Sequence, residues 1–418
     1  MKINKSILAT SIACSLLTIS IQSHAAGFQL AEYSATGLGR AYAGEAAMAE
    51  NAGAQWRNPA MLTYLEGTQV SFGAMYIDPN VDLNGTVHGS IPANSSDYAD
   101  SAVVPNLYIS HNYHNKYAVG FALGSNYGFK THLGEDFMGS HVGQQAEIIT
   151  QEANLNFAYK ATDAVSIGGG LRYVMAEGKV AARVSTAAPS SSAGATLKYV
   201  EGDTTDWGWQ AGIAWQVNPE HRVGFTYKSE VKLKLEGTAT GAGFGLVGTT
   251  SPGSLPLALP ATAELSSFNQ LTEKLALHTS INWTDWSSFE KLEADIDGVS
   301  NGHIKDENWK DNYRFAVGFS YQADPKLTLR TGVAYDTSAV DDEHRTVTIP
   351  ETDRTWLSIG AGYAWSEQLT LDAGFTYIIA KDANVAEAAE AGTTALGDFE
   401  GVTSANVLIY GVQASYKF

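Results

Sequence analysis

Apolar and polar residues alternate with a period of two through most of this chain, which limits the folds it can adopt. At the C-terminal end, one face of an extended segment carries Leu408, Tyr410, Val412, Ala414, Tyr416 and Phe418, and the other carries Gly411, Gln413, Ser415 and Lys417. This period is that of a β-strand with one apolar and one polar side. A terminal aromatic residue is typical of bacterial outer-membrane barrels, and the alternative is the last strand of a soluble sandwich.

The same pattern recurs often enough to predict fourteen strands, of which the segments 325–335 and 369–379 alternate most regularly. The predicted strands are 67–78, 101–112, 116–128, 145–160, 164–179, 204–217, 221–237, 261–269, 272–284, 309–322, 326–336, 353–365, 368–381 and 404–418.

Connection lengths between these strands alternate between short and long. Short turns are predicted at 114–115, 161–163, 218–220, 324–325 and 366–367, whereas the intervening loops are long and rich in Gly, Ser, Asp and Pro. Short turns on one side and long loops on the other are typical of outer-membrane barrels. We therefore predict an all-β fold, a 14-stranded antiparallel transmembrane barrel over residues 67–418, located in the bacterial outer membrane.

The N-terminal region divides into two predicted parts. Lys2 and Lys5 precede an apolar run at 7–21, and small residues up to Ala25 suit a signal peptidase, so 1–25 reads as a signal peptide. The single cysteine, Cys14, lies in it. Residues 26–66 are rich in Gly and Ala, with a short helix expected within 43–52. We expect them to fold into the lumen as a plug, or hatch.

Charge and motif content exclude several functions. Without the two lysines of 1–25 the net charge falls from −18 to −20, which argues against a nucleic-acid partner. No HExxH metal motif or Walker loop occurs, and we expect neither an enzyme nor a metal or other cofactor.

Several motifs, in order along the chain, resemble the FadL-type long-chain fatty-acid transporters. They are Gly27–Leu30, Gly37–Tyr42, Arg57–Ala60, Tyr76–Pro79, Ser125–Gly128, Tyr227–Lys232, Lys310–Arg314 and Ile349–Arg354. The resemblance runs from the expected mature N-terminus to Phe418. It implies a 14-stranded barrel with a hatch, in agreement with the strand count.

Two kinds of residue are candidates for substrate binding. The predicted loop between the seventh and eighth strands is apolar and lacks charge between 237 and 263, and carries Phe244, Leu246 and Leu257. These would capture a hydrophobic ligand together with the preceding loop at 180–203; the alternative is packing that closes the barrel top. The resemblance places a low-affinity site there, and aligns Lys305 and, less closely, Arg183 with the basic residues of an inner, high-affinity site.

Other basic residues are expected on lumen-facing strand positions, where they could hold a carboxylate by charge-assisted hydrogen bonds. The alternative for each is a solvated lumen network with Glu230, Asp311 and Asp372. These basic residues are Arg172, Lys228, Lys232, Lys234 and Arg314.

Two further motifs are candidates for control of the route. Pro59 fixes its own φ and biases Asn58 toward extended geometry, so Asn58-Pro59-Ala60 suits a rigid turn in the hatch. Asn126-Tyr127-Gly128 matches the kinked third strand of the family, where a glycine permits a bulge. The resemblance implies a side opening there for lateral release, and the alternative is a bulge that serves curvature alone.

Together these features predict passive, ligand-gated uptake of long-chain fatty acids with lateral release. Alternatives are uptake of aromatic hydrocarbons or other hydrophobic nutrients by the same route, or a surface receptor or adhesin barrel without transport. Expected partners are the hydrophobic ligand, outer-membrane lipid and lipopolysaccharide, and the barrel-assembly machinery, with the protein as a monomer.

Overall fold

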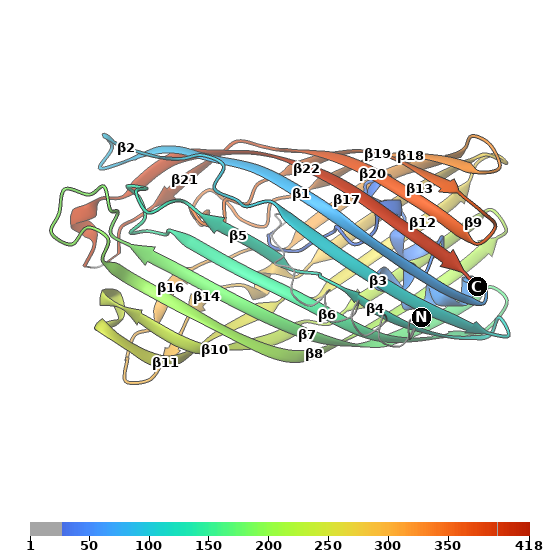
Figure 1. Cartoon of the computed structure of the whole chain (residues 1–418), viewed down its shortest axis with the longest axis horizontal. Coiled ribbons are helices and arrows are strands. Elements are labelled where there is room, and N and C mark those ends of the chain that lie inside the picture. Colours follow the sequence, from blue (N-terminus) through green and yellow to red (C-terminus); the bar gives the residue numbers. More distant parts are fainter. Residues whose placement is uncertain (1–26, 391) are drawn as a thin grey trace, which may run out of the picture.

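The computed structural model describes residues 27–390 and 392–418, so the predicted signal peptide and Cys14 lie outside the described residues. The described chain forms a closed antiparallel barrel of 14 strands (Figure 1). In chain order the strands are β1 (Thr68–Val87), β3 (Ala102–Tyr113), β4 (Tyr117–Gly124) continued by β5 (Gly128–His132), β6 (Gln145–Lys160), β7 (Val165–Arg183), β8 (Thr196–Asn218), β9 (His221–Lys228) continued by β10 (Val231–Gly241), β11 (Leu246–Leu259) continued by β12 (Thr262–Gln270), β13 (Leu275–Thr284), β17 (Asn312–Gln322), β18 (Leu327–Asp336), β19 (Arg354–Ala364), β20 (Leu369–Ala380) extended by β21 (Ala383–Glu387), and β22 (Phe399–Lys417).

The barrel closes between its first and last strands, β1 and β22. Val70 is paired with Tyr416, and Tyr76 with Tyr410. The backbone N–H of Phe418 donates to the carbonyl of Thr68 at 2.9 Å, which completes the seam. The prediction that the C-terminal strand pairs with the first strand is therefore confirmed.

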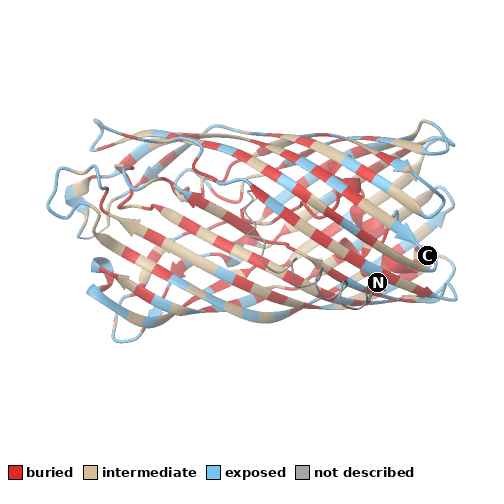
Figure 2. Ribbon diagram, viewed as in Figure 1, coloured by how far each residue is buried: buried red, intermediate tan, exposed pale blue. Residues whose placement is uncertain are grey.

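Buried and more exposed residues alternate along the strands (Figure 2). The exposed outer positions include many large apolar residues, whereas many of the buried inner positions are polar. Leu155, Trp207 and Val412 face outward and are 64%, 61% and 64% exposed, which suits a wall in contact with lipid. Short turns join strands at one end of the barrel. His114 and Asn115 form one of them with positive φ at both positions, the geometry that a two-residue hairpin favours.

The opposite end of the barrel carries long hairpins where the sequence predicted loops. β7 runs to Arg183 and β8 begins at Thr196, so half of the predicted loop at 180–203 is strand. The predicted apolar loop after the seventh strand is likewise a hairpin of β10 and β11, in which Val231 pairs with Leu259. β10 also pairs with β8 from Glu236 to Thr240, so the barrel wall continues into residues that the sequence predicted as loop. Smaller elements complete this end: β2 (Ile91–Ser95), β14 (Lys291–Glu293), β15 (Asp295–Ile296) and β16 (His303–Asp306).

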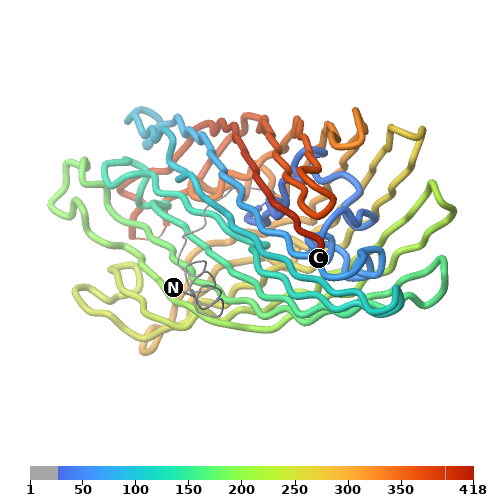
Figure 3. The backbone as a smooth tube through the Cα atoms, turned by 45° about the vertical axis from the view of Figure 1, so that its right-hand side comes forward, coloured from blue at the N-terminus to red at the C-terminus, as the bar shows by residue number. Residues whose placement is uncertain are grey.

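The N-terminal segment, defined here as residues 27–66, runs inside the barrel in the half nearer the short turns (Figures 1 and 3). Its helices α2 (Ala35–Leu38) and η3 (Pro59–Tyr64) contact opposite parts of the wall: α2 lies against β19, β20 and β22, and η3 against β6, β7 and β8. Within the predicted helix at 43–52 the structure has a single 3-10 turn, η2 (Glu45–Ala47), followed by α3 (Ala54–Arg57). None of the described helices has the length and apolar character needed to cross a membrane.

Candidate functional site

The third barrel strand is interrupted between β4 and β5, at residues Ser125–Tyr127. Before the interruption, Ala118 and Ala122 face inward, whereas Phe129 and Thr131 do so after it. The inward positions therefore change from even to odd numbers, because a shift of one residue reverses the face of every side chain that follows. The predicted kink residues Asn126, Tyr127 and Gly128 lie at this interruption, and all three are buried.

Residues of the N-terminal segment supply the backbone partners of the interrupted strand. The N–H of Gly128 donates to the carbonyl of Phe28 at 2.8 Å, and the N–H of Leu30 donates to the carbonyl of Asn126 at 2.7 Å. Gln29 and Tyr127 form an antiparallel bridge between them. The kink is thus paired with a segment that is not part of the barrel wall.

The side chain of Phe28 lies inside an aromatic pocket, which we define by Tyr127, Phe129, Trp286, Phe289 and Trp309. The centroid of the Phe28 ring is 4.6 Å from that of Trp286 and 5.6 to 6.1 Å from the other four. Edge-to-face and tilted contacts at these separations are favourable. Phe28 is 1% exposed, so it fills a site that could otherwise hold another apolar group.

A buried polar network connects the kink to two neighbouring strands. The Asn126 amide donates to the Glu152 carboxylate at 2.7 Å, and the Arg172 guanidinium donates twice to the same carboxylate, at 2.9 and 2.8 Å. Lys228 Nζ donates to Asn126 Oδ1 at 3.1 Å. The predicted lumen positions of Arg172 and Lys228 agree with these contacts, and Glu152 is a partner that the sequence analysis did not identify.

Two more strands are interrupted close to this network. β9 gives way to β10 at Ser229–Glu230, and β11 to β12 at Pro260–Ala261. The Tyr127 hydroxyl donates to the Pro260 carbonyl at 2.7 Å, and Arg172 donates to the Ser229 carbonyl at 2.9 Å. The interruption at Pro260 is therefore joined to the kink directly, and the interruption at Ser229 is joined to it through Arg172 and Glu152.

The interruption at Ser229–Glu230 also corrects two of the predicted lumen cations. It turns Val231, Leu233 and Leu235 inward, so Lys232 and Lys234 lie on the outer face and are exposed. The prediction that these lysines face the lumen was wrong, because it continued the alternation of β9 without the one-residue shift.

The remaining predicted network residues have mixed partners. Arg314 faces inward and pairs with Asp336 at 2.8 Å, while Asp372 pairs with Arg330 at 2.9 Å. Glu230 lies 3.5 Å from the exposed Lys232. Asp311 accepts hydrogen bonds from Trp283 and Ser287.

The predicted hatch motif forms a capped turn pressed against the barrel wall. Asn58 caps η3 by accepting from the Ala60 N–H at 3.0 Å, and Pro59 occupies the first helical position, where its missing N–H costs nothing. The Asn58 amide also donates to the Ile213 carbonyl of β8 at 3.1 Å. Gly168 of β7 faces this turn so closely that a Cβ there would lie 2.6 Å from the Pro59 carbonyl carbon.

Ion pairs fix the N-terminal segment to the other side of the barrel. Arg40 is buried and pairs with Glu45 and Glu50. Glu50 also pairs with Arg330 of β18 at 2.9 Å. Truncating one member of such a buried set leaves its partner uncompensated, which costs about 3 to 5 kcal/mol.

The two predicted carboxylate-binding residues lie at the long-hairpin end and have separate partners. Lys305 of β16 pairs with the buried carboxylate of Glu387. Burial lowers the pKa of Lys305, but the attraction of Glu387 outweighs this, and the pKa lies above its ordinary value. Arg183 pairs with Glu135 at 3.0 Å. The structure therefore shows each cation with its own carboxylate.

Glu307 lies two residues beyond Lys305 and was missed by the sequence analysis. It is buried, and it accepts a hydrogen bond from the indole N–H of Trp309 at 2.9 Å. Burial raises its pKa to about 8, against the opposing effects of Lys305 and Trp309. This carboxyl thus carries a proton near neutral pH beside the aromatic pocket.

The predicted capture residues lie in the β10–β11 hairpin. Phe244 ends the short helix η4 (Ala242–Phe244), while Leu246 and Leu257 belong to β11. Phe244 and Leu257 are buried in the same apolar cluster as Phe28 and the aromatic pocket, and Leu246 packs against it. This cluster is continuous from the outer hairpin to the kink.

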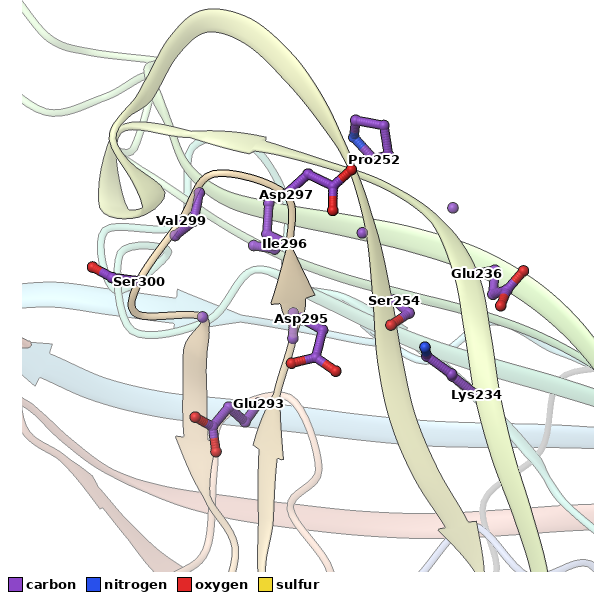
Figure 4. Close-up of a pocket in the computed structure, with 14 residues that line it drawn as sticks. Lys234, Glu236, Pro252, Ser254, Glu293, Asp295, Ile296, Asp297, Val299 and Ser300 are labelled. Atoms are coloured by element: carbon purple, nitrogen blue, oxygen red, sulfur yellow. The ribbon is translucent and has the colours of Figure 1, made fainter.

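A cavity of about 550 Å³ lies between this hairpin and β15 (Figure 4). Glu236, Glu293, Asp295 and Asp297 line it, and Lys234 is the one basic residue in its lining among the residues that the structure describes. Excess negative charge disfavours a carboxylate ligand, so this cavity is a poorer candidate than the aromatic pocket. Within 27–390 and 392–418, no three or more His, Cys, Asp or Glu residues are arranged to hold a metal ion.

The closed barrel, its apolar outer wall and its occupied lumen define an outer-membrane transport barrel. The chain belongs to the outer membrane protein transport family (OMPP1/FadL/TodX), whose model matches residues 16–418.

Individual relatives agree with this assignment. The chain is 35% identical over 409 residues to a long-chain fatty acid transport protein of Escherichia coli O6:H1, covering 90% of each chain. It is 34% identical to outer membrane protein P1 of Haemophilus influenzae, over 100% of each chain.

Solved structures share the fold at lower identity. A FadL homologue from Pseudomonas aeruginosa superposes with a TM-score of 0.84 at 22% identity, covering 94% of this chain and 100% of that one. The toluene transporter TodX of Pseudomonas putida gives 0.67 at 16% identity, covering 92% and 98%.

Proposed function

We propose that this protein takes up long-chain fatty acids across the outer membrane by passive, ligand-gated diffusion, with lateral release at the kinked third strand. In this proposal residues 27–66 act as the hatch. The family and the relatives named as fatty acid transport proteins support the substrate class. The sites and the route are inferred from the contacts described above.

One residue, Phe28, carries the argument for ligand gating. Its side chain fills the aromatic pocket, and its carbonyl accepts the hydrogen bond of Gly128 at the kink. A ligand whose acyl chain occupied the pocket would displace the ring and, with it, a backbone partner of the interrupted strand. Ligand binding and loosening of the kink would then be the same event, because one residue takes part in both.

The proposed path begins at the β10–β11 hairpin. Apolar residues of this hairpin belong to the cluster that contains Phe28, so an acyl chain would remain in apolar surroundings from Phe244 to the pocket. Lys305 would then hold the carboxylate, exchanging Glu387 for the ligand, and Arg183 is a second candidate for this contact. The hatch turn at Asn58-Pro59-Ala60 would keep the lumen closed below.

Growth on oleate in a deletion strain provides the test. We expect the wild-type gene to restore oleate growth and uptake of labelled oleate without an energy source, and Phe28→Glu to reduce uptake because a charge would enter the aromatic pocket. Phe28→Leu, which keeps an apolar side chain in the pocket, serves as the matched control. Failure of the wild-type gene to restore uptake would contradict the proposal.

Uptake of aromatic hydrocarbons by the same route is the second candidate. The aromatic lining of the pocket and the shared fold with a protein named as a toluene transporter favour it. Mass spectrometry of ligand co-purified with the protein separates the two, since a linear acyl chain and a ring have different masses. Consistent absence of any hydrophobic ligand would favour a receptor or adhesin.

A further inference from the structure

Lys228 is a buried cation at the kink with few partners. It ends β9 and is 5% exposed, and among the described residues its ammonium has one hydrogen-bond partner, Asn126 Oδ1 at 3.1 Å. Its Nζ stands 4.9 Å from the centroid of the Trp56 ring. Within residues 27–390 and 392–418 no ion pair joins it to a carboxylate, and burying an ammonium without a paired charge is costly.

The neighbouring charges do not neutralise Lys228. Glu152 is already engaged by Arg172 at 2.8 Å and by the Asn126 amide. Arg57 lies 3.9 Å from Glu264. Each of these two carboxylates therefore has its own guanidinium, which leaves Lys228 without a paired carboxylate.

Buried side-chain amides without hydrogen-bond partners lie on β3 and β6, the two strands that neighbour the interrupted strand. Neither side-chain polar atom of Asn154 on β6 has a partner among the described residues, and the same is true of Asn106 on β3. The two residues are 0% and 2% exposed. Asn154 lies two residues beyond Glu152, about 7 Å along the same face of the strand. Buried amides without protein partners are rare in native proteins, so these two side chains have hydrogen-bonding capacity to offer a polar group.

Room for such a group is created by the proposed gating event. Phe28 and Leu30 run alongside the kink and are hydrogen-bonded to Gly128 and Asn126. If a ligand displaced these residues, as the proposed function requires, the backbone partner of Asn126 would be removed on the side where Lys228 Nζ bonds to its amide. Lys228, Asn154 and Asn106 would then be the polar side chains nearest to a head group at the interruption.

We propose that Lys228, assisted by the Asn154 and Asn106 amides, is a second head-group site, which receives the ligand's carboxylate at the kink before lateral release. This site rests on the proposed function and adds a step to it. The carboxylate passes from Lys305 at the outer end to Lys228 at the exit. Binding at Lys228 would supply the carboxylate partner that this lysine lacks, so the head group would cross the apolar pocket between two basic residues.

Paired probes with one chain and two head groups test the proposal. In the deletion strain, uptake of labelled oleate and of labelled oleyl alcohol is compared for wild type, Lys228→Met, Lys228→Arg and Asn154→Leu. We expect Lys228→Met to slow oleate at least tenfold and oleyl alcohol less than twofold, Lys228→Arg to retain most oleate uptake, and Asn154→Leu to slow oleate selectively. Lys232→Met, an exposed lysine of the adjoining strand, should change neither rate.

The outcomes distinguish this site from the function on which it rests. Heat-dependent mobility on gels verifies that each variant is a folded barrel. A Lys228→Met protein that takes up oleate at the wild-type rate overturns the site, and so does an equal loss for both probes, which would assign Lys228 a structural role. A wild-type protein that takes up neither probe would instead overturn the proposed function.

Discussion

Replacing Gly168 with alanine should unseat the hatch turn. This glycine of β7 faces the lumen, and a Cβ built on it would lie 2.6 Å from the Pro59 carbonyl carbon and 2.9 Å from Ala60 Cα, with the Ala60 nitrogen closer still. Carbon atoms in favourable contact are about 3.5 to 4.0 Å apart. The turn must therefore move by about 1 Å, and its atoms are backbone, which cannot rotate away.

The free-energy cost of this shift can be taken from other overpacked protein interiors. Extra methyl groups in a well-packed interior cost about 1 to 3 kcal/mol. If that cost falls on the seated state alone, the population of unseated hatch rises by about 5- to 150-fold. Gly169 provides a matched control on the same strand, because the nearest atom to its added Cβ is the Gln210 carbonyl oxygen at an ordinary 3.4 Å.

Two measurements report the seating of the hatch. Ala52 is fully buried in the N-terminal segment, so the labelling rate of Ala52→Cys by a thiol reagent measures how often the segment leaves its place. Current through single barrels in a planar bilayer measures opening of the lumen. We expect both to increase with Gly168→Ala and to stay at the wild-type level with Gly169→Ala. Identical behaviour of the two variants would refute the reasoning.

Three further predictions concern stability, measured by urea unfolding in lipid bilayers. Tyr127→Phe keeps the ring but leaves the Pro260 carbonyl unpaired, so the free energy of unfolding should fall by about 0.5 to 1.5 kcal/mol. Tyr410→Phe on the outer wall is the control and should not change the free energy of unfolding. Equal effects of the two variants would count against the link between the strand interruptions. Arg172→Met should cost about 3 to 5 kcal/mol, since it leaves Glu152 uncompensated, and a second change, Glu152→Gln, should recover part of it; a double variant less stable than Arg172→Met would contradict this. The raised pKa of Glu307, about 8 against an ordinary 4.5, means that the folded state holds a proton that the unfolded state releases. Stability should therefore be highest below pH 4.5, fall between pH 4.5 and 8, and level off above, and Glu307→Gln should remove this component of the pH dependence; an unchanged pH profile would show that the carboxyl is not protonated in the fold.

The sequence predicted the barrel well because its signal is local. Period-two alternation reports which side of a strand faces lipid, and each strand carries that signal by itself. The strand count and the seam between β1 and β22 followed from it. The same reasoning failed for the long hairpins, where pairing with neighbouring strands, as between β10 and β8, continued through residues that read as loop.

The candidate site was predicted in parts, and its assembly was not. Resemblance to the family pointed to Asn58 and Tyr127, and alternation placed Lys228 in the lumen. Alternation also placed Lys232 there wrongly, because nothing local marks Ser229–Glu230 as the point where the strand shifts by one residue.

The sequence by itself determined that this chain forms a closed, lipid-facing wall with a segment left over at its N-terminus. Only the tertiary structure decided what that segment does to the wall: Phe28 enters an aromatic pocket built from distant residues and pairs with the kink. The Tyr127 hydroxyl and the Pro260 carbonyl, 133 positions apart, show the physical reason. Contacts between such distant positions depend on how the whole barrel closes, and no local pattern of residues records that.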